Sequence, residues 1–149
     1  MNKPVWKIKS FNELIATELY SILKARIDVF VVEQNCPYPD LDGYDKEAIH
    51  LWAEENGEAL AYCRIFNKGI KYEVCSIGRV LTTENSRGKN LGRQLMKYAV
   101  ETVENRFRTS EIRISAQDYL LKFYSEFGFE DTGIKYLEDD IPHTEMIRK

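Results

Sequence analysis

The sequence has little cysteine, no long apolar run and no metal-ligand pattern, and each absence excludes a kind of protein. Its three cysteines, Cys36, Cys63 and Cys75, are irregularly spaced and include no CxxC pair, so neither a disulfide framework nor a zinc site is indicated. No apolar stretch approaches the roughly 20 residues that cross a bilayer, and the N-terminus shows no apolar leader. We therefore expect a reduced, cytoplasmic protein with no membrane partner and no metal.

A strong net charge of either sign is also missing. Lysine and arginine number 21 and aspartate and glutamate 24, which gives a formal charge of −3. A general polyanion-binding surface is therefore excluded, and we expect no nucleic-acid partner. With 149 residues, 44% of them hydrophobic, the chain suits one globular domain over residues 1–149 that buries a sizeable core.

The N-terminal part of the sequence predicts a strand, a helix and a long loop. Residues 5–9 alternate apolar and polar side chains, as a half-buried strand does. Ser10 and Glu13 have the spacing of a capping box, and apolar residues recur at helical intervals over 14–27, so a helix is expected to follow. The prolines and glycine in 36–43 exclude a helix there and indicate a surface loop.

The middle of the sequence predicts an antiparallel meander. Residues 50–55 and 58–66 have strand character and are separated by Asn56-Gly57, the residue pair preferred in a two-residue type I′ turn. Residues 73–81 supply a third strand-like run. Three consecutive antiparallel strands are therefore expected in this part of the chain.

The C-terminal part adds a long amphipathic helix over 91–107, a strand over 111–116, a short helix over 118–127 and closing strands over 129–136 and 144–148. No internal repeat is present. This order of elements predicts an α/β fold with a mixed antiparallel and parallel central sheet flanked by helices. The long helix is expected to serve as the parallel crossover.

A basic, glycine-containing turn between the third meander strand and the long helix is the most informative segment. The free N–H groups of a first helical turn and the helix dipole favour an anion, and Arg87, Lys89 and Arg93 add full charges. A Walker P-loop is excluded because its upstream glycine and its hydroxyl residue are missing. We therefore predict a bound anion at the start of the 91–107 helix.

With this order in place, the chain resembles the GCN5-related N-acetyltransferase (GNAT) superfamily, and within it the small bacterial ElaA-like proteins. Residues 87–92, Arg-Gly-Lys-Asn-Leu-Gly, fit the pyrophosphate-loop pattern Q/R-x-x-G-x-G/A, with Asn90 in place of its central glycine. Tyr124 stands four residues before Gly-Phe, as in the family. The ElaA-like features are the segments 26–38 and 138–143. Asparagine tolerates left-handed backbone angles, so the loop geometry is expected to survive.

The resemblance implies a GNAT fold and acetyl-CoA as co-substrate. Loop amides would hold the coenzyme pyrophosphate, and the end of the preceding strand would pair with the pantetheine arm. The N–H of Leu81 would polarise the thioester carbonyl. The residues expected to bind the coenzyme are Val80, Leu81, Thr82, Arg87, Gly88, Lys89, Asn90, Leu91, Gly92, Arg93, Gln117 and Tyr124.

Tyr124 is the residue that the resemblance assigns to catalysis. A phenol near the departing thiolate can donate a proton to it. The alternative, a tyrosine that packs in the core, stays open.

Three residues are candidates for the general base that deprotonates an attacking amine. Glu33 follows an apolar segment, and burial there would raise its pKa toward a useful range; the alternative is a structural pair with Arg26 or Arg79. His143 has an imidazole, which titrates near neutral pH, and lies on a segment that approaches the acyl-transfer site in such folds. His50 is a weaker third candidate.

An acidic cluster in the predicted loop, Asp40, Asp42, Asp45 and Glu47, is no EF-hand, because the glycine and glutamate positions of that motif do not match. Two interpretations stay open. The aspartates either cap turns in a solvated loop or attract a cationic amine.

The function that the resemblance implies is acetyl-CoA-dependent N-acetylation of a primary amine by direct attack. The acceptor is a small molecule or a peptide, and a homodimer is an assembly found among such relatives. The alternative is a catalytically silent acyl-CoA-binding domain, which keeps the phosphate loop and needs no base.

Overall fold

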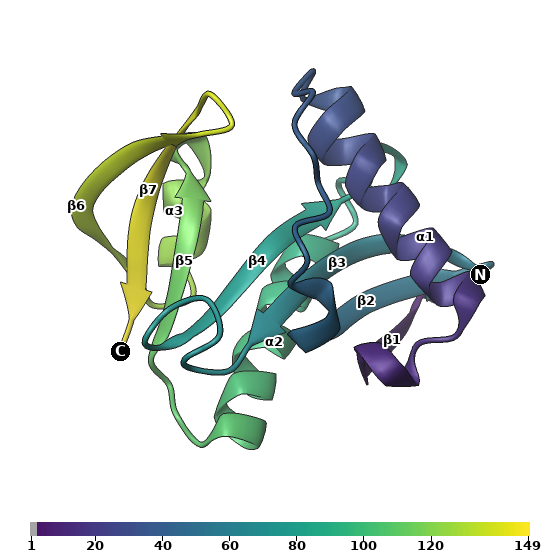
Figure 1. Cartoon of the computed structure of the whole chain (residues 1–149), viewed down its shortest axis with the longest axis horizontal. Coiled ribbons are helices and arrows are strands. Elements are labelled where there is room, and N and C mark those ends of the chain that lie inside the picture. Colours follow the sequence, from purple (N-terminus) through teal and green to yellow (C-terminus); the bar gives the residue numbers. More distant parts are fainter. Residues whose placement is uncertain (1–2) are drawn as a thin grey trace.

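A seven-stranded mixed sheet with helices on both faces organises residues 3–149, the part of the chain that the computed structural model describes (Figure 1). In order of hydrogen-bonded neighbours, the strands are β1 (Val5–Ser10), β2 (Ile49–Glu55), β3 (Glu58–Phe66), β4 (Cys75–Thr82), β5 (Ile112–Gln117), β7 (Ile141–Arg148) and β6 (Phe129–Glu138). The helices are α1 (Ala16–Arg26), its π-helical continuation η2 (Ile27–Glu33), α2 (Leu91–Phe107) and α3 (Leu121–Ser125), and single turns occupy Phe11–Glu13, Asp45–Glu47, Glu84–Ser86 and Asp118–Leu120. The predicted α/β class is confirmed.

A two-residue turn joins β2 to β3. Asn56 and Gly57 adopt φ angles of 52° and 77°, and the left-handed region at both positions is what a type I′ turn requires. Glu55 consequently lies opposite Glu58. The predicted hairpin is confirmed, and its register fixes which side chains of β2 and β3 share a face.

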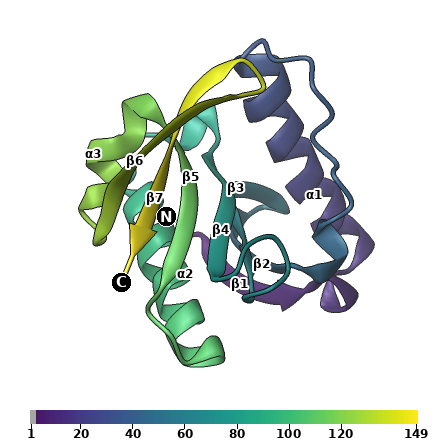
Figure 2. The ribbon, with the colours of Figure 1, turned by 60° about the vertical axis from the view of Figure 1, so that its left-hand side comes forward.

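Side chains of β2 and β3 alternate between two separate cores. Leu51 and Cys63 belong to the core beneath α2, whereas Trp52 and Tyr62 pack against α1 on the other face. Figures 1 and 2 show α1 and α2 on opposite sides of the sheet. The buried face of α2 consists of Leu91, Leu95, Met96, Ala99, Val100, Thr102 and Val103. The predicted amphipathic helix is therefore confirmed.

The first helix begins later than the sequence pattern predicts. Ser10 donates its backbone N–H to Glu13 at 2.8 Å, as in a capping box, but the box closes a single 3₁₀ turn. The α-helix begins only after Ile15, whose N–H donates to Glu18 at 3.1 Å. Ile15 is 58% exposed and lies outside the core. The helix then continues through η2, which reaches the functional site.

The acidic loop is held by buried arginines. Arg26, fully buried in α1, donates to Asp40 at 2.8 Å and to Asp45 at 2.6 Å, and Arg64 of β3 donates to Asp45 at 2.9 Å and also to Asp42. Burial opposes ionisation, but the bonds and charges of the two arginines lower the pKa of Asp45. The interpretation as a solvated loop is therefore wrong for Asp40 and Asp45. Removing one partner of such a buried pair costs about 3–5 kcal/mol.

Strands β4 and β5 run parallel and pair only near their beginnings. Cys75 lies opposite Ile112 and Ser76 opposite Arg113, and beyond these pairs the two strands diverge (Figure 1). The crossover between them is α2, as predicted. A loop of residues 83–90 joins the end of β4 to the N-terminus of α2, so the unpaired amides of α2 lie at the edge where the sheet opens.

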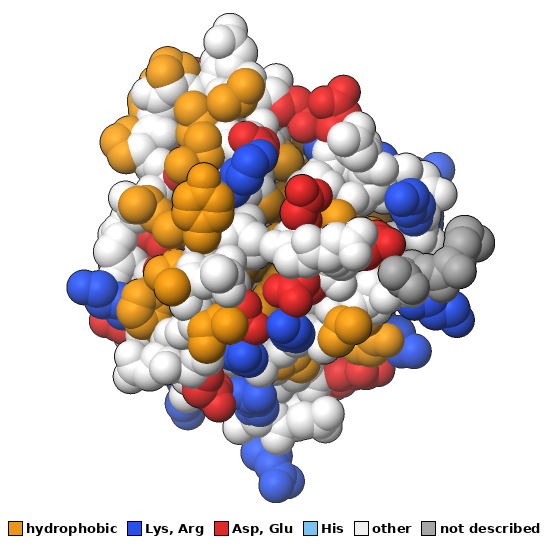
Figure 3. All heavy atoms as spheres, turned by 90° about the vertical axis from the view of Figure 1, so that its right-hand side faces the viewer, with side chains coloured by type: hydrophobic (Ala, Val, Ile, Leu, Met, Phe, Trp, Pro, Cys, Tyr) orange, Lys and Arg blue, Asp and Glu red, His pale blue; other side chains and the backbone are white. Residues whose placement is uncertain are grey.

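The face beside α1 carries charges of both signs. Figure 3 shows acidic and basic side chains interspersed there with apolar ones. Exposed apolar side chains of α1 and η2 include Tyr20 and Val32. Within residues 3–149, no helix combines the length and the apolar composition needed to cross a membrane.

Candidate functional site

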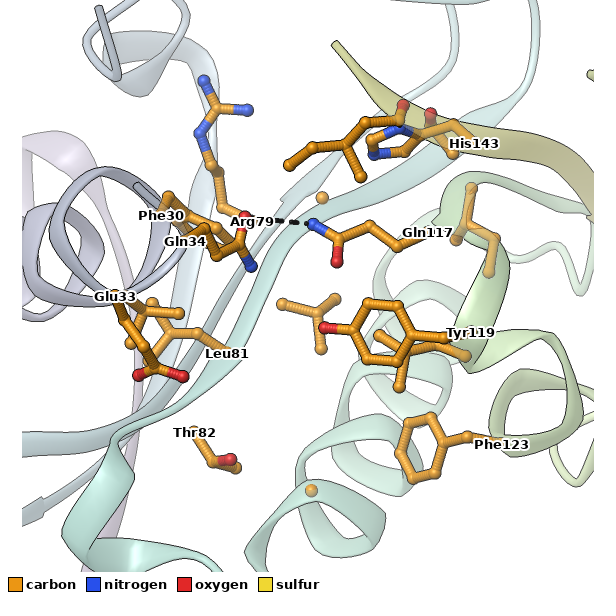
Figure 4. Close-up of a pocket in the computed structure, with 18 of the residues that line it drawn as sticks. Phe30, Glu33, Gln34, Arg79, Leu81, Thr82, Gln117, Tyr119, Phe123 and His143 are labelled. Atoms are coloured by element: carbon orange, nitrogen blue, oxygen red, sulfur yellow. Dashed lines mark hydrogen bonds between the residues drawn. The ribbon is translucent and has the colours of Figure 1, made fainter. Parts of the chain in front are cut away.

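A cleft of about 750 Å³ opens where β4 and β5 separate. Figure 4 shows Thr82 and Phe123 toward one end of it and His143 toward the other. All of the residues predicted to bind the coenzyme line this cleft, except Lys89, whose side chain is exposed. That these residues bind the coenzyme stays a prediction.

The loop before α2 has the backbone geometry of an anion-binding turn. Gly88 and Asn90 adopt φ angles of 83° and 64°, so Asn90 takes the left-handed conformation that a glycine would take at low cost. The first bond at the start of α2 runs from the N–H of Gln94 to the carbonyl of Asn90, at 3.3 Å. Among the described residues, the N–H groups of Leu91 and Gly92 before it have no backbone partner. These amides and the helix dipole favour a negative ligand.

The arginines of the loop are each paired with a carboxylate. Arg87 donates to both oxygens of Glu33, at 2.6 and 3.0 Å, and to the carbonyl of Thr82 at 2.9 Å. Arg93 makes a similar two-point contact with Glu126, at 3.2 Å for each bond. All four charged groups are partly exposed. Exposed pairs of this kind are weak in water, so a phosphate ligand can replace the carboxylate partners.

The end of β4 forms one wall of the cleft through Val80, Leu81 and Thr82. The side chain of Leu81 is buried in the core under α1. A Cβ at Gly92 would make ordinary van der Waals contacts with Phe123, at 3.6 Å, and with Thr82, at 3.9 Å. The start of α2 therefore lies between the two walls.

A hydrogen bond spans the cleft. The side-chain amide of Gln117, at the end of β5, donates to Gln34, just after η2, at 3.3 Å (Figure 4). Each amide keeps further donor and acceptor atoms for a ligand. Gln117 therefore lies where the resemblance places a pantetheine contact.

Tyr124 reaches the cleft from α3 and is 6% exposed. Burial raises the pKa of its phenol, and the neighbouring Cys63 and Tyr119 contribute in the same direction. Among residues 3–149, no partner bonds to its hydroxyl. A phenol is protonated throughout the physiological range and so has a proton to give, but the raised pKa makes this one a weaker acid. Its ring also packs against Phe123 and Phe129, so it serves the core as well.

His143 is buried at the other end of the cleft with a fixed ring orientation. Its Nδ1 lies 2.7 Å from the carbonyl oxygen of Ile141, and since a carbonyl only accepts, this nitrogen carries the proton. The Nε2 atom lies 3.4 Å from Glu138. The imidazole also stacks on Tyr136, with ring centroids 6.1 Å apart. In the neutral ring, Nε2 therefore has a free lone pair.

The other two base candidates have different environments from those predicted. Glu33 lines the cleft but is exposed, and its partner is Arg87 rather than Arg26 or Arg79. The expectation that burial activates it is therefore wrong. His50 is fully buried between the hydroxyl of Tyr62, at 2.7 Å, and a backbone carbonyl, outside the cleft. Burial lowers the pKa of His50, which is consistent with a structural role.

Cys36 closes the cleft beside the β6–β7 turn. Its thiol donates to the carbonyl of Asp139 at 3.2 Å, and Tyr38 donates to Asp140. Burial and the two aspartates raise the pKa of Cys36. A thiol of raised pKa is a poor nucleophile. Among residues 3–149, no three His, Cys, Asp or Glu side chains are grouped so that they could hold a metal ion.

Comparison with known proteins identifies the family. A model of the acetyltransferase (GNAT) domain matches residues 21–149. The chain belongs to the GNAT family. ElaA from Escherichia coli K12 is 40% identical to it over 146 residues, 97% of this chain and 95% of ElaA. The ElaA crystal structure matches with a TM-score of 0.91 at 38% identity, over 98% of this chain and 99% of that one.

A second solved structure is similar to the same extent. It is an acyl-CoA N-acyltransferase from Pseudomonas aeruginosa, with a TM-score of 0.93 and 39% identity over 98% of this chain and 99% of that chain. The resemblance to the GNAT superfamily and to ElaA-like proteins is thereby confirmed. The left-handed loop, the free amides and the paired arginines of this chain form a site suited to an anionic ligand.

The sequence analysis did not predict three residues that lie in or beside the cleft. Gln34, Arg79 and Tyr136 lie in the cleft or against its histidine, and no local pattern marks the first two. The position of Tyr136 could have been predicted from the turn that follows it. Asp139 and Asp140 both have positive φ and form a two-residue turn. A hairpin with its turn at these two residues pairs Tyr136 with His143.

Proposed function

We propose that the protein is an acetyl-CoA-dependent N-acetyltransferase that acetylates a primary amine. The main support for this proposal is that a single cleft connects the three groups. The cleft extends from the free amides at the N-terminus of α2, past the phenol of Tyr124, to the imidazole of His143. A site for anion binding, a proton donor and a proton acceptor thus share one cavity, as direct acyl transfer requires.

The phosphate loop and the two cleft walls would hold the co-substrate. Loop amides from Gly88 to Arg93 would bind the pyrophosphate, and Val80 to Thr82 with Gln117 would bind the pantetheine arm. Acetyl-CoA supplies the activated thioester. The backbone N–H of Leu81 lies in the hydrogen-bond ladder with Tyr62 of β3. The neighbouring N–H of Val80, which this alternation turns away from β3, would instead stabilise negative charge on the carbonyl oxygen as the amine attacks.

His143 is the proposed general base. Its Nδ1–H is committed to the carbonyl of Ile141, so Nε2 is the atom that accepts a proton from the amine. Glu138 lies beside Nε2 and would stabilise the imidazolium that forms. Tyr124 would then protonate the departing thiolate of coenzyme A. Glu33 is assigned a binding role through Arg87 instead.

The acceptor end of the cleft favours a positively charged amine. Glu138 and Asp139 line it, and within residues 3–149 neither forms an ion pair with a lysine or arginine. The cation there, Arg79, is matched by Asp40 at 2.8 Å. An ammonium group on a small molecule or a peptide therefore meets uncompensated negative charge.

The test measures release of the free coenzyme A thiol from acetyl-CoA in the presence of polyamines, amino acids and short peptides. His143→Gln should lower kcat/KM about 100-fold. Glu138→Gln keeps the imidazole and removes only the carboxylate that would stabilise the imidazolium, so it should lower kcat/KM less than His143→Gln does. Tight binding of acetyl-CoA without turnover with any amine would instead identify a silent acyl-CoA-binding domain.

A further inference from the structure

Strand β4 contains a bulge at the point where it enters the cleft. Leu81 pairs with Tyr62 and Gly78 with Arg64, so one residue of β3 faces two residues of β4, Arg79 and Val80. Arg79 has a φ of 52°, in the left-handed region. In bulges of this shape that position normally belongs to glycine, because other side chains disfavour it.

The side chain of Arg79 explains why the bulge can keep an arginine there. Its Nε donates to the carboxylate of Asp40 at 2.8 Å, and its Nη2 donates to the backbone carbonyl of the same residue at 2.9 Å. Two bonds to one residue fix both the direction and the rotation of the guanidinium. The two bonds to Asp40 thus hold the backbone of Arg79 at its unfavourable, left-handed φ angle.

Asp40 is itself held from the opposite direction. Arg26 donates to its second carboxylate oxygen at 2.8 Å and to its carbonyl at 3.2 Å. Arg26 is completely buried and Asp40 nearly so, with 9% of its surface exposed. We refer to Arg26, Asp40 and Arg79 as the bulge clamp. A rigid clamp from α1 through the loop to β4 keeps the bulge in one conformation.

The clamp acts next to the reacting groups. Arg79, Val80 and Leu81 all line the cleft, and Figure 4 places Arg79 on the same side as Gln34 and Leu81, opposite Gln117 and His143. A bulge re-aims the peptide groups that follow it. The Leu81 N–H faces Tyr62 of β3 in the hydrogen-bond ladder, so the N–H that turns toward the cleft and depends on the bulge for its direction is that of Val80.

We infer that Arg79 is a positioning residue: through Asp40 it holds the left-handed bulge that aims the Val80 amide at the acyl carbonyl. This inference rests on the proposed function. It differs from a direct contact between Arg79 and the acceptor, since two of the guanidinium nitrogens are already bound to Asp40.

Two substitutions of Arg79 distinguish positioning of the bulge from direct contact with the acceptor. Arg79→Gly removes the clamp but keeps a residue that adopts the left-handed angle readily, whereas Arg79→Ala removes the clamp and disfavours the angle. We expect kcat to fall about tenfold in the glycine variant and about 100-fold in the alanine variant, the latter comparable to losing one oxyanion donor. The Kd for coenzyme A should stay within about threefold, because the phosphate loop is unchanged. This binding also verifies folding.

A second measurement does not depend on activity. In the free protein, ¹⁵N order parameters of Val80 and Leu81 should fall in both variants from a rigid value of about 0.85 toward 0.6. Unchanged order parameters would overturn the clamp. Equal loss of kcat in both variants with a raised KM for the amine would show direct acceptor binding instead. If the wild type turns over no amine, the proposed function fails and the order parameters alone decide the clamp.

Discussion

Glu33 and Arg87, 54 residues apart in sequence, form a two-point ion pair across the mouth of the cleft, with N–O distances of 2.6 and 3.0 Å. The pair joins the end of η2 to the loop that is proposed to bind pyrophosphate. Arg87 therefore has a carboxylate partner at the place where phosphate oxygens are expected. The raised pKa of Arg87, caused mainly by its bond to Glu33, is consistent with this pairing.

Substitution of Glu33 distinguishes a binding role from catalysis. Glu33→Gln frees Arg87 for the coenzyme, so we expect coenzyme A to bind about two- to threefold more tightly, within the range of exposed ion pairs. Turnover should change less than threefold. Calorimetry gives the Kd and thiol release gives kcat. A drop in kcat as large as that caused by His143→Gln would instead identify Glu33 as the general base.

Removal of one hydroxyl tests the proton donor. Tyr124→Phe keeps the ring in the core, so we expect an unchanged Tm and an unchanged Kd for acetyl-CoA, with kcat lowered about 100-fold. The matched control is Tyr119→Phe, which deletes the hydroxyl of an exposed cleft tyrosine. Full activity of the Tyr124 variant would show that the residue only packs.

We expect the left-handed loop residue Asn90 to control coenzyme affinity. Asn90→Gly should bind coenzyme A at least as well as the wild type, because glycine adopts a φ of 64° without steric cost. Asn90→Val should bind about tenfold more weakly, since a β-branched residue resists this angle. Isothermal titration with coenzyme A gives both values. Equal affinity of the valine and glycine variants would contradict the dependence on loop geometry.

A buried carboxylate should make stability depend on pH. Burial of Glu18 opposes ionisation, but bonds from Lys9, the Ile15 N–H and Lys7 outweigh it and lower the pKa to about 2. Its ordinary value is 4.5, so the stabilisation is complete above that pH and is lost as the pH falls toward 2.

We therefore expect Glu18→Gln to lower the free energy of unfolding by about 2 kcal/mol at pH 7 and by much less at pH 3. Urea unfolding at both pH values measures the difference. Glu101→Gln, on the exposed side of α2, should change stability little at either pH. A loss of equal size at pH 3 and pH 7 would show that the shape of the side chain matters rather than its charge.

The sequence was sufficient to predict the elements that depend on residues close together in the chain. The type I′ turn at Asn56-Gly57 and the apolar stripe of α2 depend only on residues within a few positions, because backbone angles and helical periodicity are set there. The phosphate loop belongs to this class too, since Asn90 adopts the left-handed angle expected of it. The mixed sheet followed from the order of these elements.

Only the tertiary structure shows which charged residues are buried and which partners they pair with. Nothing near Asp40 in the sequence shows that it is buried between Arg26 and Arg79, which lie 14 and 39 residues away. The same holds for the pairing of Glu33 with Arg87. It also holds for His143, because the contact with the carbonyl of Ile141 in the folded hairpin determines which ring nitrogen carries the proton. A charge can be buried only where distant partners replace water, and only the folded chain brings those partners together.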